Sequence, residues 1–256
     1  MVQQAAVPVT GKRALNRLSR HRDYLQTALQ IATQDGLEAL TMQRLAAEVD
    51  AAIGTVYTYF PSKGALLAEV QREAIDRLLG SYLLLRPDVE ARVADADPSV
   101  AAIAHLVAFA RFWIESMDTF PMEQHLLQQL MSDTRRAVPD DELSRVLPAI
   151  LRLLDLARDR FEVAAQVGAL RPGEAMDRTL TFASALSGLL QLDKLNRWDN
   201  DLLDGGRLAL ALVDDLLVAW GATADALTAS HSVLDAIARQ HPLARSLTPE
   251  PSKTEP

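Results

Sequence analysis

The segment from Ile53 to Lys63, IGTVYTYFPSK, carries side chains suited to contacting a polyanion. Val56 and Phe60 are four residues apart and so share one face of a short helix, which Pro61 ends. Hydroxyl groups bond phosphate oxygens, and aromatic rings pack on thymine methyl groups. Lys63 opens the next helix, where an ammonium group and free backbone N–H groups suit a phosphate. The side chains left free to meet a duplex are Thr55, Tyr57, Thr58 and Tyr59.

Two long helices are expected to support this segment. The first runs from Asn16 to Gln34, and the second runs from Ser62, a good N-cap, to about Leu85. Between them, a short helix begins at the N-cap Thr41 and a second covers residues 52–60. Helices of two turns are not stable alone, so the two short helices must pack against the long helices. This order predicts a helix-turn-helix, whose second short helix enters the DNA major groove.

The chain has 256 residues and a net charge of −8, but the charge is unevenly distributed. Residues 1–63 hold seven Lys or Arg against five Asp or Glu, so this part carries +2 and the remainder −10. Five basic residues and no acid fall between Lys12 and Arg22. This cluster is either a solvated helix entrance or an arm that follows the minor groove or the phosphates. We expect residues 1–15 to form a disordered basic arm.

The composition indicates an all-α globular protein. Hydrophobic residues make up 49% of the chain and recur at helical spacing in almost every segment, without a convincing strand. Cysteine is absent, which excludes disulfides, thiolate metal sites and thiol nucleophiles. No signal peptide and no apolar run near the roughly 18 residues of a membrane span is recognised. We expect a cytoplasmic protein with no membrane partner.

The chain resembles the tetracycline-repressor (TetR) family of transcriptional regulators from about Leu18 to Leu79. The resemblance rests on GLEALTMQRLAAEV followed by IGTVYTYFPSKGALL. We accordingly expect a helix-turn-helix DNA-binding domain at residues 16–62 and a larger helical ligand-binding and dimerisation domain at residues 63–240. Residues 241–256 are expected to be a disordered tail.

The resemblance also implies roles for single residues. Gln43 is similar to a base-contacting position, and Ile53 stands where relatives often carry a polar, base-reading residue, so that it offers only apolar contact. The implied groove contacts are Thr55 and Tyr57, and the implied phosphate contacts are Thr41, Tyr59 and Lys63. The full set of expected DNA-binding residues is Thr41, Gln43, Arg44, Ile53, Thr55, Tyr57, Thr58, Tyr59 and Lys63.

Structural roles are the alternative for several of these residues. Tyr57 and Tyr59 can pack against neighbouring helices. Thr41 can serve only as a helix cap, and Gln43 and Arg44 can be ordinary solvated residues.

The turn before the second short helix departs from the family pattern. Relatives commonly have Gly-Val-Ser, whereas this chain has Asp50-Ala51-Ala52. Aspartate adopts the left-handed conformation at some cost, and alanine as an N-cap costs about 1 kcal/mol relative to serine. Gly64 stands where relatives often carry an acid. These changes bear on local stability.

The remainder of the chain is expected to be helical after a hinge at residues 88–98. The expected helices cover residues 99–117, 122–131, 141–167, 173–197, 204–226 and 228–240.

Two of these helices have faces typical of a dimer interface. One face consists of mostly small residues, both apolar and polar: Leu180, Ala183, Ser184, Ser187, Gly188 and Gln191. The other is broadly apolar, and comprises Leu208, Leu212, Val213, Leu216, Leu217 and Trp220. Together they predict a two-fold four-helix interface. Alternatively, these faces fill the core of one protomer.

Aromatic and methionine side chains gather in the acidic part of the chain and suit an adaptable apolar pocket. Plain core packing is the alternative. The candidate ligand-binding residues are Phe109, Phe112, Trp113, Met117, Phe120, Met131, Phe161 and Phe182. No metal site is expected, because the spacing of His105, Glu115, Asp118, Glu123 and His125 matches no metal-binding motif.

These features predict a ligand-responsive transcriptional regulator that is not an enzyme. We expect a repressor that binds a palindromic DNA operator as a homodimer and is released by a small apolar or amphipathic effector. No cofactor is expected. The alternatives are a DNA-binding adaptor without a ligand, or an all-α enzyme, for which no phosphate loop, nucleophile elbow or metal motif is present in the sequence.

Overall fold

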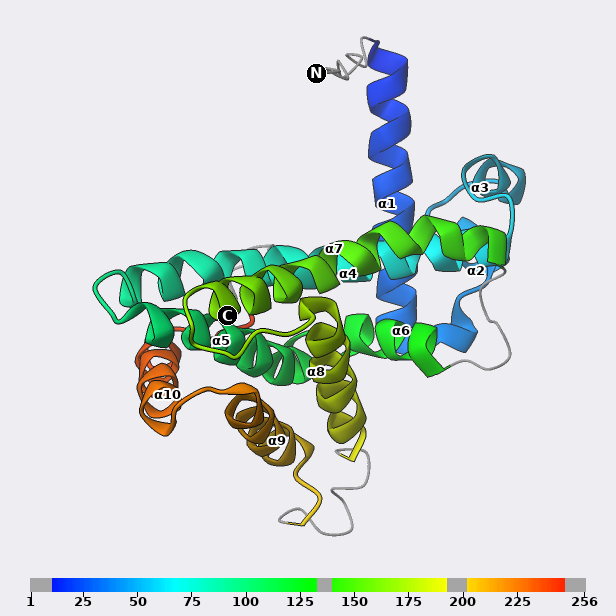
Figure 1. Ribbon diagram of the computed structural model, residues 1–256. Helices are drawn as coiled ribbons and strands as arrows, with labels where there is room; N and C mark the ends of the chain where they lie inside the picture. Colours follow the sequence, from blue (N-terminus) through cyan, green and yellow to red (C-terminus); the bar gives the residue numbers. More distant parts are fainter. Residues whose placement is uncertain (1–10, 133–139, 193–201, 247–256) are drawn as a thin grey trace, which may run out of the picture. The chain divides into compact units, whose positions relative to one another are not determined.

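The computed structural model describes residues 11–132, 140–192 and 202–246. These ranges are helical and contain no strand, which confirms the predicted all-α class. The chain divides into two compact units (Figure 1). The smaller unit comprises Met1–Glu73 with Ser132–Val146, and the larger unit comprises Ala74–Met131 with Leu147–Pro256.

The smaller unit contains the expected helix-turn-helix. Its elements are α1 (Lys12–Asp35), the short 3₁₀ helix η1 (Leu37–Ala39), α2 (Met42–Glu48), α3 (Ile53–Tyr59) and the first turns of α4 (Lys63–Arg92). Apolar side chains from α1, α2, α3 and α4 bury one another and form its core. Fully buried members of this core include Ala28, Leu45, Val56, Phe60 and Leu66.

Both expected N-caps are present in this unit. The Thr41 hydroxyl accepts a hydrogen bond from the Arg44 backbone N–H at 3.1 Å, at the start of α2. The Ser62 hydroxyl accepts one from the Ala65 backbone N–H at 2.9 Å, at the start of α4. Each cap satisfies a backbone donor that the helix itself leaves unpaired.

The first helix begins earlier than expected. Lys12 to Leu15 lie in α1, although they were expected in a disordered arm, and the expectation for these four residues is wrong. The segment KRALNRL contains good helix formers and no proline or internal glycine, so the helix continues back to Gly11. Residues 1–10 of the expected arm lie outside the described residues.

The larger unit is built around α5 (Pro98–Thr119), which packs against α8 (Ala175–Leu190), α9 (Gly205–Trp220) and α10 (Ala224–Ala238) (Figure 1). It also contains the later turns of α4, α6 (Pro121–Ser132) and most of α7 (Asp140–Gln166). α5 is long and apolar enough to span a bilayer, contrary to the expectation that no segment is. However, 67% of its most apolar window is buried, as in the core helix of a globular unit.

Helix α4 continues through Pro87 to Arg92, so the expected hinge at residues 88–98 shrinks to residues 93–97. A proline inside a helix removes one backbone hydrogen bond. Two effects offset this loss in the turns that follow. Val89 and Val93 are buried, and Arg86 pairs with Glu90 one turn away at 3.3 Å.

The two helices expected at residues 204–226 and 228–240 correspond to α9 and α10, but the break between them lies earlier than expected, at residues 221–223. Gly221 has a φ of 119°, a left-handed conformation that ends α9, and the Thr223 hydroxyl then caps α10 by accepting from the Ala226 N–H at 3.2 Å. α8 ends at Leu190, before the expected Arg197, and residues 193–201 lie outside the described part.

The first residues of the expected disordered tail are packed. Leu243 and Ala244 are each 2% exposed. The Arg245 guanidinium lies 2.6 Å from the Asp88 carboxylate of α4, and the Arg245 backbone N–H donates to the Ser81 hydroxyl at 2.9 Å. The expectation of disorder is therefore wrong for residues 241–246, and residues 247–256 lie outside the described part.

Candidate nucleic-acid interface

The turn between α2 and α3 has the geometry of a Schellman motif. Asp50 has a φ of 48°, the left-handed conformation usually given to glycine. The Ala51 N–H donates to the Ala46 carbonyl at 2.9 Å, and the Asp50 N–H donates to the Ala47 carbonyl at 3.3 Å. The turn is thus intact without the glycine that relatives commonly carry, and Asp50 bears the conformational cost.

Ala52 takes the N-cap position of α3 with extended backbone and makes no side-chain cap bond. The Thr55 N–H bonds the Ala52 carbonyl at 2.8 Å, which closes the first turn. Because alanine offers no acceptor, α3 begins without the cap that a serine provides.

The buried face of α3 is as the sequence predicts. Val56 and Phe60 are each 0% exposed and anchor the helix. Ile53 and Tyr57, which share a face at a spacing of four residues, are 41% and 47% exposed. Large apolar and aromatic side chains with this exposure offer a contact surface, and the packing alternative does not apply to Tyr57.

Two hydroxyl residues of α3 are positioned differently from Tyr57. The Thr58 hydroxyl is exposed but donates its proton to the Thr55 carbonyl at 2.6 Å. Thr55 itself is only partly exposed. The hydroxyl oxygens of Thr55 and Thr58 can still accept hydrogen bonds, but neither side chain extends from the helix as far as Tyr57.

Tyr59 packs against α1, as in the packing alternative. Its ring meets the Tyr24 ring edge-on at 5.0 Å between centroids and lies 6.1 Å from the His21 ring. The Arg17 guanidinium lies over the Tyr59 ring, 5.8 Å from its centroid. The contacts with α1 hold the Tyr59 ring in place, so only its hydroxyl group could contact a phosphate.

The polar residues of α2 have separate roles. Gln43 is exposed. The Arg44 guanidinium lies 2.5 Å from the Asp35 carboxylate and 3.8 Å from the Glu48 carboxylate, so its charge is already compensated within the unit. Thr41 accepts the capping bond, and its own hydroxyl proton has no acceptor among the described residues. Arg44 is therefore placed to link α1 and α2.

Lys63 is exposed at the first residue of α4, with no ion-pair partner within the described ranges. Nearby, the His21 ring lies 3.0 Å from the Glu69 carboxylate and 5.1 Å from the Phe60 ring. His21 and Glu69 tie α1 to α4 beneath α3. Reasoning from the sequence missed this pair, because no spacing along the chain relates the two residues.

The larger unit contains an apolar cavity of about 110 Å³ between α5, α6, α7 and α8. Of the predicted ligand-binding residues, Phe109, Trp113 and Phe182 line it. The lining includes no charged residue. The other lining residues are Leu127, Ile150, Leu153, Leu154, Ala157, Thr179, Leu180, Ala183, Ser184, Leu186 and Ser187.

The remaining predicted ligand-binding residues lie elsewhere. Phe112 and Phe161 are 0% and 1% exposed and belong to the core, where the Phe161 ring meets the Trp220 ring edge-on at 5.4 Å. Met117 and Phe120 do not line the cavity. The side chain of Met131 lies outside the described part.

Two titratable groups are buried near this cavity's aromatic wall. The Tyr82 ring meets the Phe109 and Phe112 rings edge-on, and burial raises the pKa of its hydroxyl to about 12. His105 is 8% exposed, and burial, followed by the positive charge of Arg160, lowers its pKa to about 4. Within the described residues, the Tyr82 hydroxyl and the His105 Nδ1 have no hydrogen-bond partner. The described part holds no cluster of three or more potential metal ligands.

The predicted dimer faces are only partly free. Val213 and Leu217 are 0% exposed inside the larger unit, and Trp220 contacts the Arg178 guanidinium and Phe161. The remaining members of both faces are partly or fully exposed, and comprise Leu180, Ala183, Ser184, Ser187, Gly188, Gln191, Leu208, Leu212 and Leu216.

The smaller unit defines a helix-turn-helix protein of the all-α class. Residues 25–70 match the family model described as bacterial regulatory proteins, tetR family. A stretch of 59 residues is 39% identical to the HTH-type transcriptional repressor KstR of Mycolicibacterium smegmatis, and covers 23% of this chain and 29% of that protein. Residues 25–70 of this chain are therefore similar to the DNA-binding domain of the TetR family of bacterial regulatory proteins.

The match with the curated relatives is confined to part of each protein, between 27% and 47% of their length. Solved structures extend the similarity of fold to most of the chain. A Rhodococcus sp. RHA1 protein of unknown function has a TM-score of 0.59 at 19% identity, covering 78% of this chain and 94% of that one. The transcriptional regulator FadR of Bacillus subtilis, solved with stearoyl-CoA, has a TM-score of 0.55 at 13% identity, covering 75% and 97%.

Proposed function

We propose that this protein is a ligand-responsive transcriptional repressor that binds a palindromic operator as a homodimer. The observation that carries the proposal is the exposed face of α3. Ile53 and Tyr57 project from a short helix whose opposite face is fully buried on a capped helix-turn-helix. An aromatic and an aliphatic side chain on such a helix suit thymine methyl groups in the major groove.

Backbone contacts flank this face in the proposal. Lys63 supplies an exposed ammonium group at the start of α4, and the Thr41 hydroxyl proton, at the start of α2, has no acceptor among the described residues. Groups of this kind fix the register of a protein on a duplex without reading its sequence. Gln43, exposed on α2, is the proposed polar base contact.

The proposed effector site is the cavity between α5, α6, α7 and α8. Its lining is apolar apart from the hydroxyls of Thr179, Ser184 and Ser187, so it suits an uncharged apolar group. At about 110 Å³ it is smaller than the roughly 300–1,000 Å³ of typical ligand sites. An effector must therefore separate the surrounding helices as it enters, and preference for that enlarged state is what couples binding to a change of conformation.

The proposed homodimer is supported by the geometry of DNA recognition and by the exposed parts of α8 and α9. One α3 reads only a few base pairs, whereas two related by a two-fold axis read half-sites about 34 Å apart. Leu208, Leu212 and Leu216 form a partly exposed apolar row on α9, and Leu180 is 47% exposed on α8. A second copy that covers these leucines would remove them from water.

The test of the proposal is selection of bound sequences from a random duplex library by the purified protein. A palindromic motif with half-sites about one helical turn apart is expected. Tyr57→Ala should lose affinity for the selected site and keep salt-sensitive non-specific binding, whereas Lys63→Ala should weaken binding to all duplexes alike. A folded protein that enriches no sequence would refute specific recognition and favour the adaptor without a ligand, or another function for the larger unit.

A further inference from the structure

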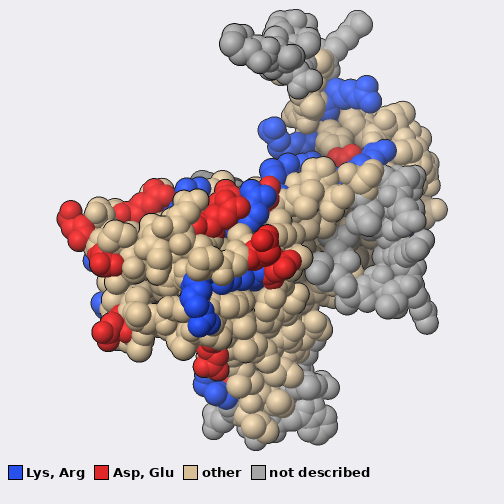
Figure 2. Space-filling model, in the orientation of Figure 1, with Lys and Arg blue, Asp and Glu red and all other residues tan. Residues whose placement is uncertain are grey.

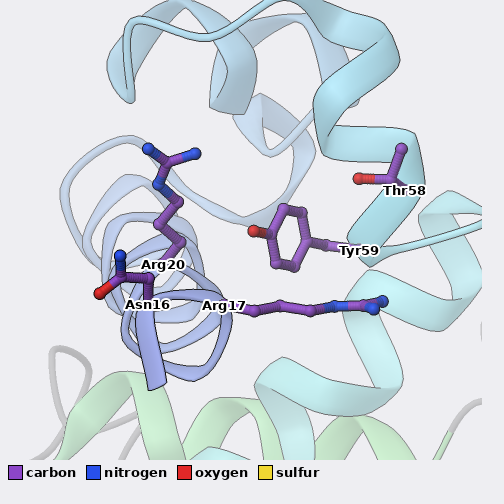
Figure 3. A pocket seen from close by; sticks show the side chains of 5 residues that line it. All are labelled: Asn16, Arg17, Arg20, Thr58 and Tyr59. Atoms are coloured by element: carbon purple, nitrogen blue, oxygen red, sulfur yellow. The ribbon is translucent and has the colours of Figure 1, made fainter. Parts of the chain in front are cut away.

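The amino-terminal half of α1 and the end of α3 border an open cleft of about 420 Å³, lined by Asn16, Arg17, Arg20, Thr58 and Tyr59 (Figure 3). We propose that this cleft binds a phosphate of the DNA backbone, so that α1 forms a second contact with the duplex outside the helix-turn-helix. This inference rests on the proposed DNA-binding function and adds the residues that take the additional backbone contact.

The lining is almost entirely made of hydrogen-bond donors. Arg17 and Arg20 each offer a guanidinium, Asn16 an amide and Tyr59 a hydroxyl. Thr58 uses its hydroxyl proton on the Thr55 carbonyl and serves as a side wall. Figure 3 shows Asn16, Arg17 and Arg20 coming from α1, and Thr58 and Tyr59 from α3, with the Tyr59 hydroxyl directed towards α1. Arg17 extends along the Tyr59 ring, whereas Arg20 and Asn16 point away from it. A planar guanidinium fits phosphate oxygens in a fork, which makes a phosphate the matching ligand.

The two guanidinium charges are not neutralised by the protein. Arg17 lies over the Tyr59 ring, and within the described residues neither Arg17 nor Arg20 forms an ion pair. No acidic residue lines the cleft. Asp23 lies on the neighbouring cleft that Arg20 also borders, beside the α2–α3 turn, and it makes no ion pair with Arg20. The two guanidinium groups point in different directions (Figure 3), so each is open to an anion at its own side of the cleft, without competition from a carboxylate of the lining.

The site is held in place before DNA arrives. The Tyr59 ring is fixed by the Tyr24 ring at 5.0 Å, and α1 is joined to α4 by His21 and Glu69 at 3.0 Å. Arg17 and Arg20 are three residues apart, and Tyr24 follows four residues later, so all three lie on one side of the helix. The side of α1 that packs on Tyr59 thus also carries the two arginines. Because α1 and the Tyr59 ring are already held in place, the backbone of the site needs little ordering when DNA binds.

DNA is the source of the phosphate because of where the cleft lies. Tyr59 is the last residue of α3, two positions after Tyr57 on the proposed groove-reading helix. Basic side chains gather over α1, whereas acidic and basic side chains are mixed over the larger unit (Figure 2). A duplex carries about one negative charge per 1.7 Å of its axis, so a duplex seated on α3 presents phosphates to its end.

The experiment measures the affinity of the full-length protein for its selected site and for random duplex, over a range of salt concentrations. The test variant is Arg17→Ala with Arg20→Ala, and the matched control is Arg22→Ala, which removes an exposed charge from α1 outside the cleft. A third protein, Arg17→Lys with Arg20→Lys, keeps both charges. Thermal melting followed by circular dichroism confirms that each variant is folded.

The double alanine variant should bind both duplexes more weakly and lower the slope of log affinity against log salt by about 1.8, or about 0.9 for each charge. The ratio of the wild-type affinity to the variant's affinity should therefore fall about twelvefold when the salt concentration rises from about 50 to about 200 mM. Arg22→Ala should keep nearly the wild-type slope, and the double lysine variant should retain most of it.

Each other result identifies which statement fails. If the wild type binds no duplex, the proposed function fails and this inference fails with it. If the wild type binds and the double alanine variant keeps its affinity and slope, only the cleft is refuted. An equal loss in Arg22→Ala would show general surface charge and overturn the cleft as a site. Saturable binding of inorganic phosphate without DNA, lost in the double alanine variant, would overturn DNA as the source.

Discussion

His105 should make the stability of the larger unit depend on pH. Its folded pKa is about 4, against about 6.5 in an unfolded chain, because burial and the charge of Arg160 disfavour the imidazolium. Between these two values the unfolded chain binds a proton that the folded protein excludes, so stability rises with pH across this window and is lost on acidification. From pH 7 to pH 5 the expected loss from this residue is about 2 kcal/mol.

The assay is urea unfolding followed by tryptophan fluorescence, since Trp113 and Trp220 lie in the larger unit. The test variant is His105→Gln, and the control is His125→Gln, which replaces an exposed histidine on α6. His105→Gln should lose about 2 kcal/mol less than the wild type when the pH falls from 7 to 5. His125→Gln should keep the wild-type loss. An unchanged pH dependence in His105→Gln would refute the assignment of the buried neutral imidazole.

Two further substitutions test local features of the chain. Asp50→Gly should raise the free energy of unfolding by about 0.5–1 kcal/mol, because glycine adopts the left-handed conformation at the α2–α3 turn without a steric penalty. The control Ala47→Gly, inside α2, should instead lower it by about 1 kcal/mol. A lower melting temperature for Asp50→Gly would contradict this reasoning. Tyr82→Phe should stabilise the larger unit by about 1 kcal/mol in urea unfolding, because it removes a buried hydroxyl without a described partner and keeps the ring contacts with Phe109 and Phe112. Destabilisation would mean that the hydroxyl is hydrogen-bonded.

Much of the fold could be predicted from the sequence because its signals are local. The spacing of Val56 and Phe60 determined which face of α3 is buried, and Thr41 and Ser62 cap the helices that their positions predict. Caps and helical periodicity depend on residues three or four positions apart, which can be read directly from the chain. The exposure of Tyr57 followed from the same reasoning.

The sequence predictions were wrong where contacts with residues distant in the chain outweigh the local sequence pattern. Pro87 was expected near a helix end, but burial of Val89 and Val93 carries α4 past it. Residues 241–246 were expected to be disordered, but Arg245 finds Asp88 more than 150 positions earlier in the chain. Long-range contacts of this kind leave no period in the sequence.

The sequence by itself therefore determined the helix-turn-helix, its anchors and the basic character of the first helix, since each follows from residue type and short spacing. Only the tertiary structure decided which aromatic residues line a cavity and which fill the core, because that depends on how α5, α7 and α8 meet. It also decided that Arg44 is paired within the protein, and that Arg17 and Arg20 lie beside Tyr59, some 40 positions away, with their charges free.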